Sequence, residues 1–169
     1  TVFVVTPDGT ATPWITDPLL AGDKTFCGHD DALFDIGANG IAITDDAVFV
    51  AVSDHAAIVE IPILDDGTAG EPVEIVGPDC EALGGIDDME RADDGTFWAA
   101  LNLQNRIGRI DPDGTIGVLV DDPALDFPAT VRVGDRDGVA ALYVTSFALT
   151  NAVAGLRAHP SLAVWSPLE

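Results

Sequence analysis

The sequence predicts an all-β fold assembled from a repeated unit of four short strands. Runs rich in Val, Ile, Phe and Trp, which favour strands, recur in sets of four over roughly 45 residues. Turns rich in Asp recur at fixed offsets: Asp46, Asp94 and Asp137 follow the first strand of a unit, and Asp66 and Asp113 follow the third. No helical period of note appears. A radial array of such units is a β-propeller.

The chain opens with a hairpin and a long loop. Residues 1–5 and 11–15 favour strands, and the Thr6-Pro7-Asp8-Gly9-Thr10 segment between them favours a turn. We interpret residues 1–16 as the remnant of one blade, because no further strands accompany them. Residues 17–38 are irregular, and a loop this long in a compact domain usually serves a function or covers something.

Three larger units follow this loop, and their blades are expected at residues 39–76, 87–120 and 129–166. The expected strands are 41–43, 48–52, 57–64 and 72–76; 89–92, 96–101, 106–110 and 115–120; and 129–133, 141–147 and 161–165. These counts predict one partial propeller domain, residues 1–169, of about three and a half four-stranded blades. Because unpaired strand edges recruit partners, we expect ring closure to need N-terminal blades absent from this chain, a second chain or a symmetry mate.

The composition indicates a folded domain and excludes two classes of partner. The chain has 169 residues, of which 47% are hydrophobic, and no apolar run is long enough to span a membrane. The net charge of −22, with Lys24 as the only lysine, repels nucleic acid and anionic membranes. The many Asp residues are interpreted mainly as turn-formers, although their field would also attract a cation.

The two cysteines lie in loops that precede two of the expected inner strands. Cys27 and Cys80 come 12 and 7 residues before Asn39 and Asp87, so their loops are expected at the same end of the array. They either form a disulfide or remain free thiols. A disulfide favours an extracellular or periplasmic location over the cytoplasm.

Asn39 and Asp87 are the candidate metal ligands. They stand 48 residues apart, each beside an apolar run that is expected to form an inner strand. Inner strands of adjacent blades converge on the propeller axis, so a divalent cation could bind both oxygen-bearing side chains; Ca²⁺ is favoured, with Zn²⁺, Mn²⁺ or Mg²⁺ as alternatives. Asn39 could instead be a turn residue and Asp87 a strand cap. Asp88 is expected to be a turn residue, and Asn102 is either a substrate contact or a turn-former.

Three segments resemble the regucalcin, gluconolactonase and luciferin-regenerating-enzyme family. Asn39-Gly40-Ile41-Ala42 resembles its Asn-Gly-Leu segment; Ile86-Asp87-Asp88-Met89 with Asp94-Gly95-Thr96-Phe97-Trp98 resembles its Pro-Asp-Gly-Met and Asp-Gly-x-Leu-Trp segments; and Leu142-Tyr143-Val144-Thr145 resembles its late strand. The resemblance implies a six-bladed propeller, of which this chain is the C-terminal portion. It also implies that Asn39 and Asp87 bind the metal and that Asp87 acts as general base.

The resemblance implies a metal-dependent hydrolase of the gluconolactonase type that acts on a lactone or ester. Two departures favour an alternative, a non-catalytic propeller that serves as a calcium-binding or protein-interaction module. Pro-Asp-Gly is replaced by Ile86-Asp87-Asp88, and the metal-binding Glu that the family has near its N-terminus finds no counterpart.

Overall fold

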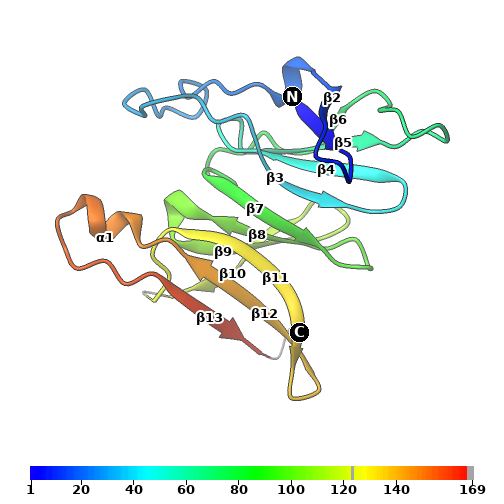
Figure 1. Cartoon of the computed structure of the whole chain (residues 1–169). Coiled ribbons are helices and arrows are strands. Elements are labelled where there is room, and N and C mark those ends of the chain that lie inside the picture. Colours follow the sequence, from blue (N-terminus) through cyan, green and yellow to red (C-terminus); the bar gives the residue numbers. More distant parts are fainter. Residues whose placement is uncertain (123, 167–169) are drawn as a thin grey trace.

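The computed structural model describes residues 1–122 and 124–166, so residue 123 and the last three residues of the expected 1–169 domain lie outside the described residues. The described strands form four antiparallel sheets in which neighbours follow chain order (Figure 1). They are β1 (Val2–Val5) and β2 (Ala11–Ile15); β3 (Ala38–Ile43), β4 (Ala47–Val52), β5 (Ala57–Pro62) and β6 (Val73–Val76); β7 (Ile86–Arg91), β8 (Phe97–Leu101), β9 (Arg106–Ile110) and β10 (Ile116–Asp121); and β11 (Pro128–Arg136), β12 (Val139–Ser146) and β13 (Ser161–Trp165).

Helix is scarce in the described part of the chain. It comprises α1 (Leu149–Val153) and the 3₁₀ turns η1 (Pro18–Leu20) and η2 (Asn102–Gln104). The prediction of an all-β fold is therefore confirmed. No helix among these residues has the length and apolar character needed to cross a membrane.

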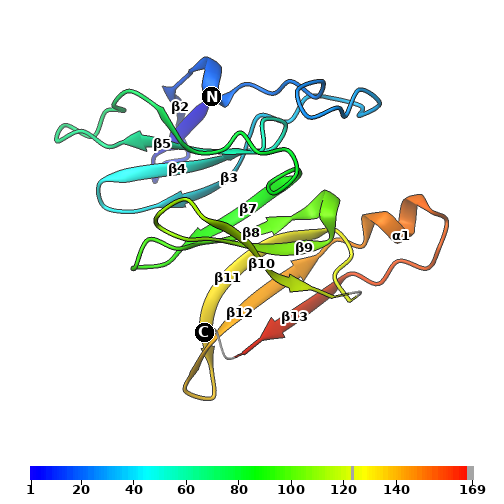
Figure 2. The same ribbon diagram turned by 180° about the vertical axis from the view of Figure 1, so that it is seen from behind.

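The sheets stack against one another in chain order, as Figures 1 and 2 show from opposite sides. The inner strand β3 packs against β7, and β7 packs against β11. Apolar side chains fill the spaces between sheets: Phe49 and Ile58 cluster with Met89, and a second cluster joins Trp98 to Leu142. Burial of these clusters supplies most of the driving force for stacking.

The buried strands explain why the sequence shows apolar runs rather than alternation. Every residue of β4 and of β8 is buried, because neighbouring sheets cover both faces of these strands. The outermost strands differ, since β1 and β6 expose about half or more of their residues.

The recurring Asp residues form turns. Asp8, Asp66, Asp94 and Asp113 each accept a hydrogen bond from the backbone N–H two residues further on, at 2.9–3.1 Å. The next residue in each turn is a glycine with positive φ, a conformation that favours glycine. Hydrogen bonds from neighbouring threonines lower the pKa of each of these carboxyls below its ordinary value. These acids are turn-formers, as expected.

Two inner strands begin earlier than the expected 41–43 and 89–92. β3 starts at Ala38 and β7 at Ile86, so Asn39 and Asp87 lie within strands rather than before them. In Figure 1 the starting ends of β3, β7 and β11 lie on the left, together with α1 and the loop that precedes β3. We call this the site end of the molecule.

Candidate functional site

A β-bulge interrupts each of the two strands that carry the candidate ligands. Ala38 lies opposite Val52 and Ile41 lies opposite Val50, so β3 has one residue more than β4 across the Asn39-Gly40 step. An extra residue bends a strand and redirects its side chains, and bulges are common beside functional sites.

The same irregularity recurs one sheet later. Ile86 lies opposite Leu101 and Met89 lies opposite Ala99, which places the extra residue of β7 at Asp87-Asp88. The bulges explain why polar residues stand inside strands that are otherwise apolar. Regular strand alternation does not predict these bulges, because the extra residue breaks the two-residue period.

Gly40 lets the two bulged strands approach closely. A Cβ atom on Gly40 would lie 2.4 Å from the backbone oxygen of Asp87 and 2.5 Å from the Cα of Asp88. Any side chain would force β3 away from β7, because these contacts are far shorter than van der Waals separation. The glycine therefore holds Asn39 next to the neighbouring sheet.

Asp87 is the centre of a small polar network. The Asn39 amide nitrogen Nδ2 donates to Asp87 Oδ1 at 2.6 Å, and Asn102 Nδ2 donates to Asp87 Oδ2 at 3.2 Å. Both carboxylate oxygens thus accept a side-chain hydrogen bond. The structure brings together all three residues that the sequence singles out for this site.

Ser53 belongs to the same network and was not predicted. Asn39 Nδ2 also donates to Ser53 Oγ at 3.1 Å, and this buried hydroxyl donates to the Ile86 carbonyl at 2.6 Å. The repeat contains a signal that could have identified it. Ser53 follows the second strand of its sheet, just as Asn102 follows the second strand of the next.

Burial raises the pKa of Asp87 above its ordinary value. Desolvation is the largest cause; the hydrogen bonds from Asn102 and Asn39 oppose it, and the negative charge of Asp88 adds to it. A half-buried carboxylate with a raised pKa is a better proton acceptor than one in water. Such a group can hold a water molecule and remove its proton.

Asp88 is not a turn residue, contrary to our expectation. It is buried within β7, where it pairs with Arg132 of β11: Nη1 lies 2.7 Å from Oδ2. Glu90, two residues further along β7, accepts a hydrogen bond from the backbone N–H of Val133 at 2.9 Å. Residues two apart lie on one face of a strand, so Asp88 and Glu90 both bind the adjacent sheet.

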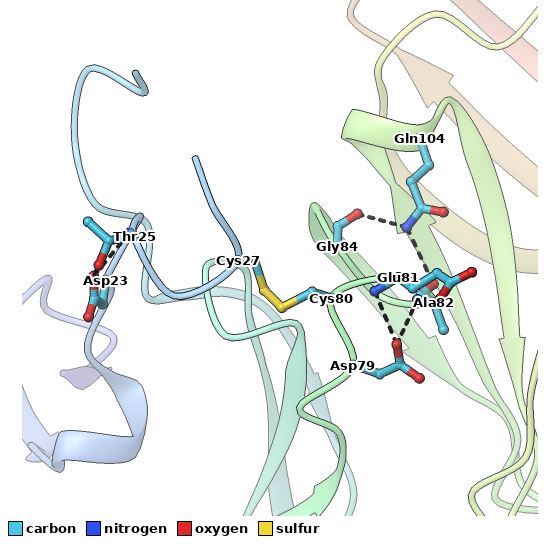
Figure 3. Close-up of a disulfide and its surroundings, with 9 residues drawn as sticks. All are labelled: Asp23, Thr25, Cys27, Asp79, Cys80, Glu81, Ala82, Gly84 and Gln104. Atoms are coloured by element: carbon cyan, nitrogen blue, oxygen red, sulfur yellow. Dashed lines mark hydrogen bonds between the residues drawn. A yellow bond between two sulfur atoms is a disulfide. The ribbon is translucent and has the colours of Figure 1, made fainter. Parts of the chain in front are cut away.

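A disulfide joins Cys27 to Cys80, with their Cα atoms 5.5 Å apart (Figure 3). It ties the loop before β3 to the segment that leads into β7. That segment is itself well anchored, because Gln104 Nε2 donates to the Gly84 carbonyl at 2.9 Å and Asp79 Oδ1 accepts from the Ala82 N–H at 2.9 Å. The bond therefore secures two loops that precede the strands of the site.

The donor set fits a hard cation in chemical type. The side chains of Asn39, Asp87, Asn102 and Ser53 all contain oxygen, the element that Ca²⁺ and Mg²⁺ prefer. Asp87 supplies the carboxylate of this set, and among the described residues no group of three or more His, Cys, Asp or Glu could hold a metal ion. The amide of Asn39 presents nitrogen to Asp87, so a rotation about its terminal bond is needed to offer oxygen.

The arrangement of sheets defines the class of fold, a partial β-propeller. No protein-family model matches the sequence, and no curated protein matches it. Solved structures do resemble the chain. A luciferin-regenerating enzyme superposes with a TM-score of 0.61 at 20% identity, over 78% of this chain and 46% of that one.

Two further solved structures resemble the chain over a similar share of their length. The calcium-binding protein regucalcin from Agrobacterium tumefaciens gives a TM-score of 0.55 at 16% identity, over 76% of this chain and 45% of its own. A catalytically inactive virginiamycin B lyase from Staphylococcus aureus, with quinupristin, gives a TM-score of 0.51 at 18% identity, over 90% of this chain and 43% of its own. At these identities the likeness shows the fold. The chain spans less than half the length of each of these structures.

Proposed function

We propose that this chain carries part of the active site of a metal-dependent hydrolase that acts on a lactone or ester. One observation carries the proposal: Asp87, with a raised pKa, accepts hydrogen bonds from Asn39 and Asn102 where two inner strands meet. The fold likeness to luciferin-regenerating enzyme and regucalcin supports it.

Each residue has a role in this proposal. Asn39 and Asp87 hold the divalent cation, most favourably Ca²⁺, and Asn102 orients the substrate and the Asp87 carboxylate. When bound, the cation polarises the acyl carbonyl and stabilises negative charge on its oxygen. Two side-chain ligands bind Ca²⁺ weakly, on the order of millimolar.

Asp87 moves the proton in the reaction. It accepts a proton from water as the water oxygen bonds to the acyl carbon, and it returns that proton to the leaving oxygen as the acyl C–O bond breaks. The net change is addition of one water across the ester bond. The raised pKa of Asp87 brings its proton affinity closer to what this role needs.

A non-catalytic calcium-binding or interaction module is the second candidate. A specific observation favours it: Asp88, which stands where the resembled family has glycine, is buried and paired with Arg132, so the strand beside Asp87 departs from the pattern of those enzymes. Such a protein binds Ca²⁺ at Asp87 without hydrolysing any lactone.

The two candidates are separated by measuring Ca²⁺ binding by calorimetry and hydrolysis of γ-butyrolactone in a pH-stat. Asp87→Asn is the test variant, and Asp94→Asn, in an exposed turn, is the matched control. We expect Asp87→Asn to lose both signals, with hydrolysis falling about 10²–10⁴-fold. Binding that depends on Asp87 without hydrolysis supports the module, and equal results for both variants rule out the site.

A further inference from the structure

The β11–β13 sheet repeats the bulge found in the two preceding sheets. Pro128 lies opposite Ser146 and Thr130 lies opposite Thr145, so the extra residue of β11 is Ala129. The bulge falls one residue after the start of the inner strand. In the two preceding sheets this position holds Asn39 and Asp87.

The residue that follows the second strand is polar in the first two of these sheets and apolar in the third. Ser53 and Asn102 occupy this position after β4 and β8, and each bonds to the bulge residue of its own sheet. After β12 the position belongs to Phe147. The third sheet thus replaces a polar pair with two apolar residues, Ala129 and Phe147.

Phe147 is exposed although its backbone is fixed. Its N–H donates to the Phe127 carbonyl at 2.9 Å, while 61% of the residue remains accessible. Leu103, which follows Asn102, is also exposed, at 54%. A Cβ atom on Gly85 would lie 2.7 Å from Leu103, which places Leu103 against the segment that leads into Asp87.

Leu103 lies beside the polar site, and Phe147 holds the repeat position that Ser53 and Asn102 occupy in the other two sheets. Exposed apolar side chains at such positions favour a ligand with an apolar portion. The net charge of −22 disfavours an anionic ligand and an anionic lipid surface. A neutral molecule with a hydrocarbon chain satisfies both conditions. Its lactone or ester group would contact the polar network around Asp87, and its hydrocarbon chain would lie against Leu103 and Phe147.

We propose that Phe147, together with Leu103, forms an apolar subsite that binds the hydrocarbon chain of the substrate. The substrate class is then a lactone or ester with an alkyl or aryl substituent, rather than a polyhydroxylated sugar lactone. This inference rests on the proposed function, since it assumes that the reacting group binds at Asp87. Contact with a five-carbon extension is expected to improve binding about tenfold.

The experiment compares γ-nonanoic lactone with γ-butyrolactone in the presence of Ca²⁺. Binding is followed by ligand-observed NMR, and hydrolysis is followed in a pH-stat. Both are measured for the unmodified protein and for Phe147→Ser, which introduces the residue type that Ser53 supplies at the equivalent position after β4. Phe3→Ser is the matched control, because Phe3 is similarly exposed, at 55%, on β1. Leu103→Ser provides a second test variant.

We expect the unmodified protein and the Phe3→Ser control to bind the nine-carbon lactone about tenfold more tightly than the four-carbon lactone. Phe147→Ser is expected to reduce this preference to within about twofold, with little change for the shorter lactone. Equal preference in Phe147→Ser and the control overturns the subsite. Chain-length preference in binding that depends on Phe147, without hydrolysis, upholds the subsite and rejects the proposed reaction, so the two failures are distinguishable.

Discussion

Gly40→Ala tests whether close packing of β3 on β7 builds the site. The new Cβ would lie 2.4 Å from the Asp87 carbonyl oxygen, whereas real Cβ atoms essentially never approach closer than 3.0 Å. The strands must therefore separate by at least 0.6 Å. A separation of this size lengthens the 2.6 Å contact between Asn39 and Asp87 to about 3.2 Å if the side chains do not adjust.

Two opposing effects determine how much Gly40→Ala lowers the free energy of unfolding. Overpacking of this kind destabilises by about 1–3 kcal/mol, and replacing glycine with alanine recovers roughly 0.4–1 kcal/mol from the unfolded chain. A net loss of about 1–2 kcal/mol corresponds to a fall in melting temperature of roughly 2–8 °C for a domain of this size. Ca²⁺ binding at Asp87 should weaken at the same time.

Gly117→Ala is the matched control for this experiment. Gly117 lies in strand β10, and a Cβ there meets no atom within 4 Å. We expect this variant to be as stable as the parent or slightly more stable in urea denaturation. Equal stability and equal Ca²⁺ affinity of the Gly40 and Gly117 variants would refute the reasoning.

Two further predictions concern stability. Desolvation raises the pKa of Asp87, so the ionised carboxylate destabilises the fold above that pKa, and this destabilisation is lost as pH falls through the raised pKa. Asp87→Asn should therefore be at least as stable as the parent protein at pH 7, and its advantage in free energy of unfolding should narrow on acidification. Urea denaturation that shows this advantage growing at lower pH would contradict the prediction. The Cys27–Cys80 bond closes a loop across a sequence separation of 53 residues, so replacing both cysteines with serine should lower the free energy of unfolding by roughly 2–4 kcal/mol. An unchanged unfolding midpoint in urea would show that the bond contributes nothing to stability.

The sequence by itself determined the class of fold and the position of most strands. Turn chemistry is local: an Asp that bonds to its own backbone and a glycine with positive φ specify a turn wherever they occur, as at Asp94-Gly95. Apolar runs such as that of β4 reflect burial on both faces, which depends on composition more than on precise geometry. The candidacy of Asn39 and Asp87 also followed from the repeat.

Only the tertiary structure decided how those residues meet. The bulges at Asn39-Gly40 and Asp87-Asp88 depend on register between strands, which the amino-acid pattern does not encode locally. Asp88 was expected to be a turn residue, yet Arg132, 44 residues away, pairs with it inside a strand. Ser53 joined the site for the same reason: its partners, Asn39 and the Ile86 carbonyl, come from distant segments that are brought together only when the sheets stack.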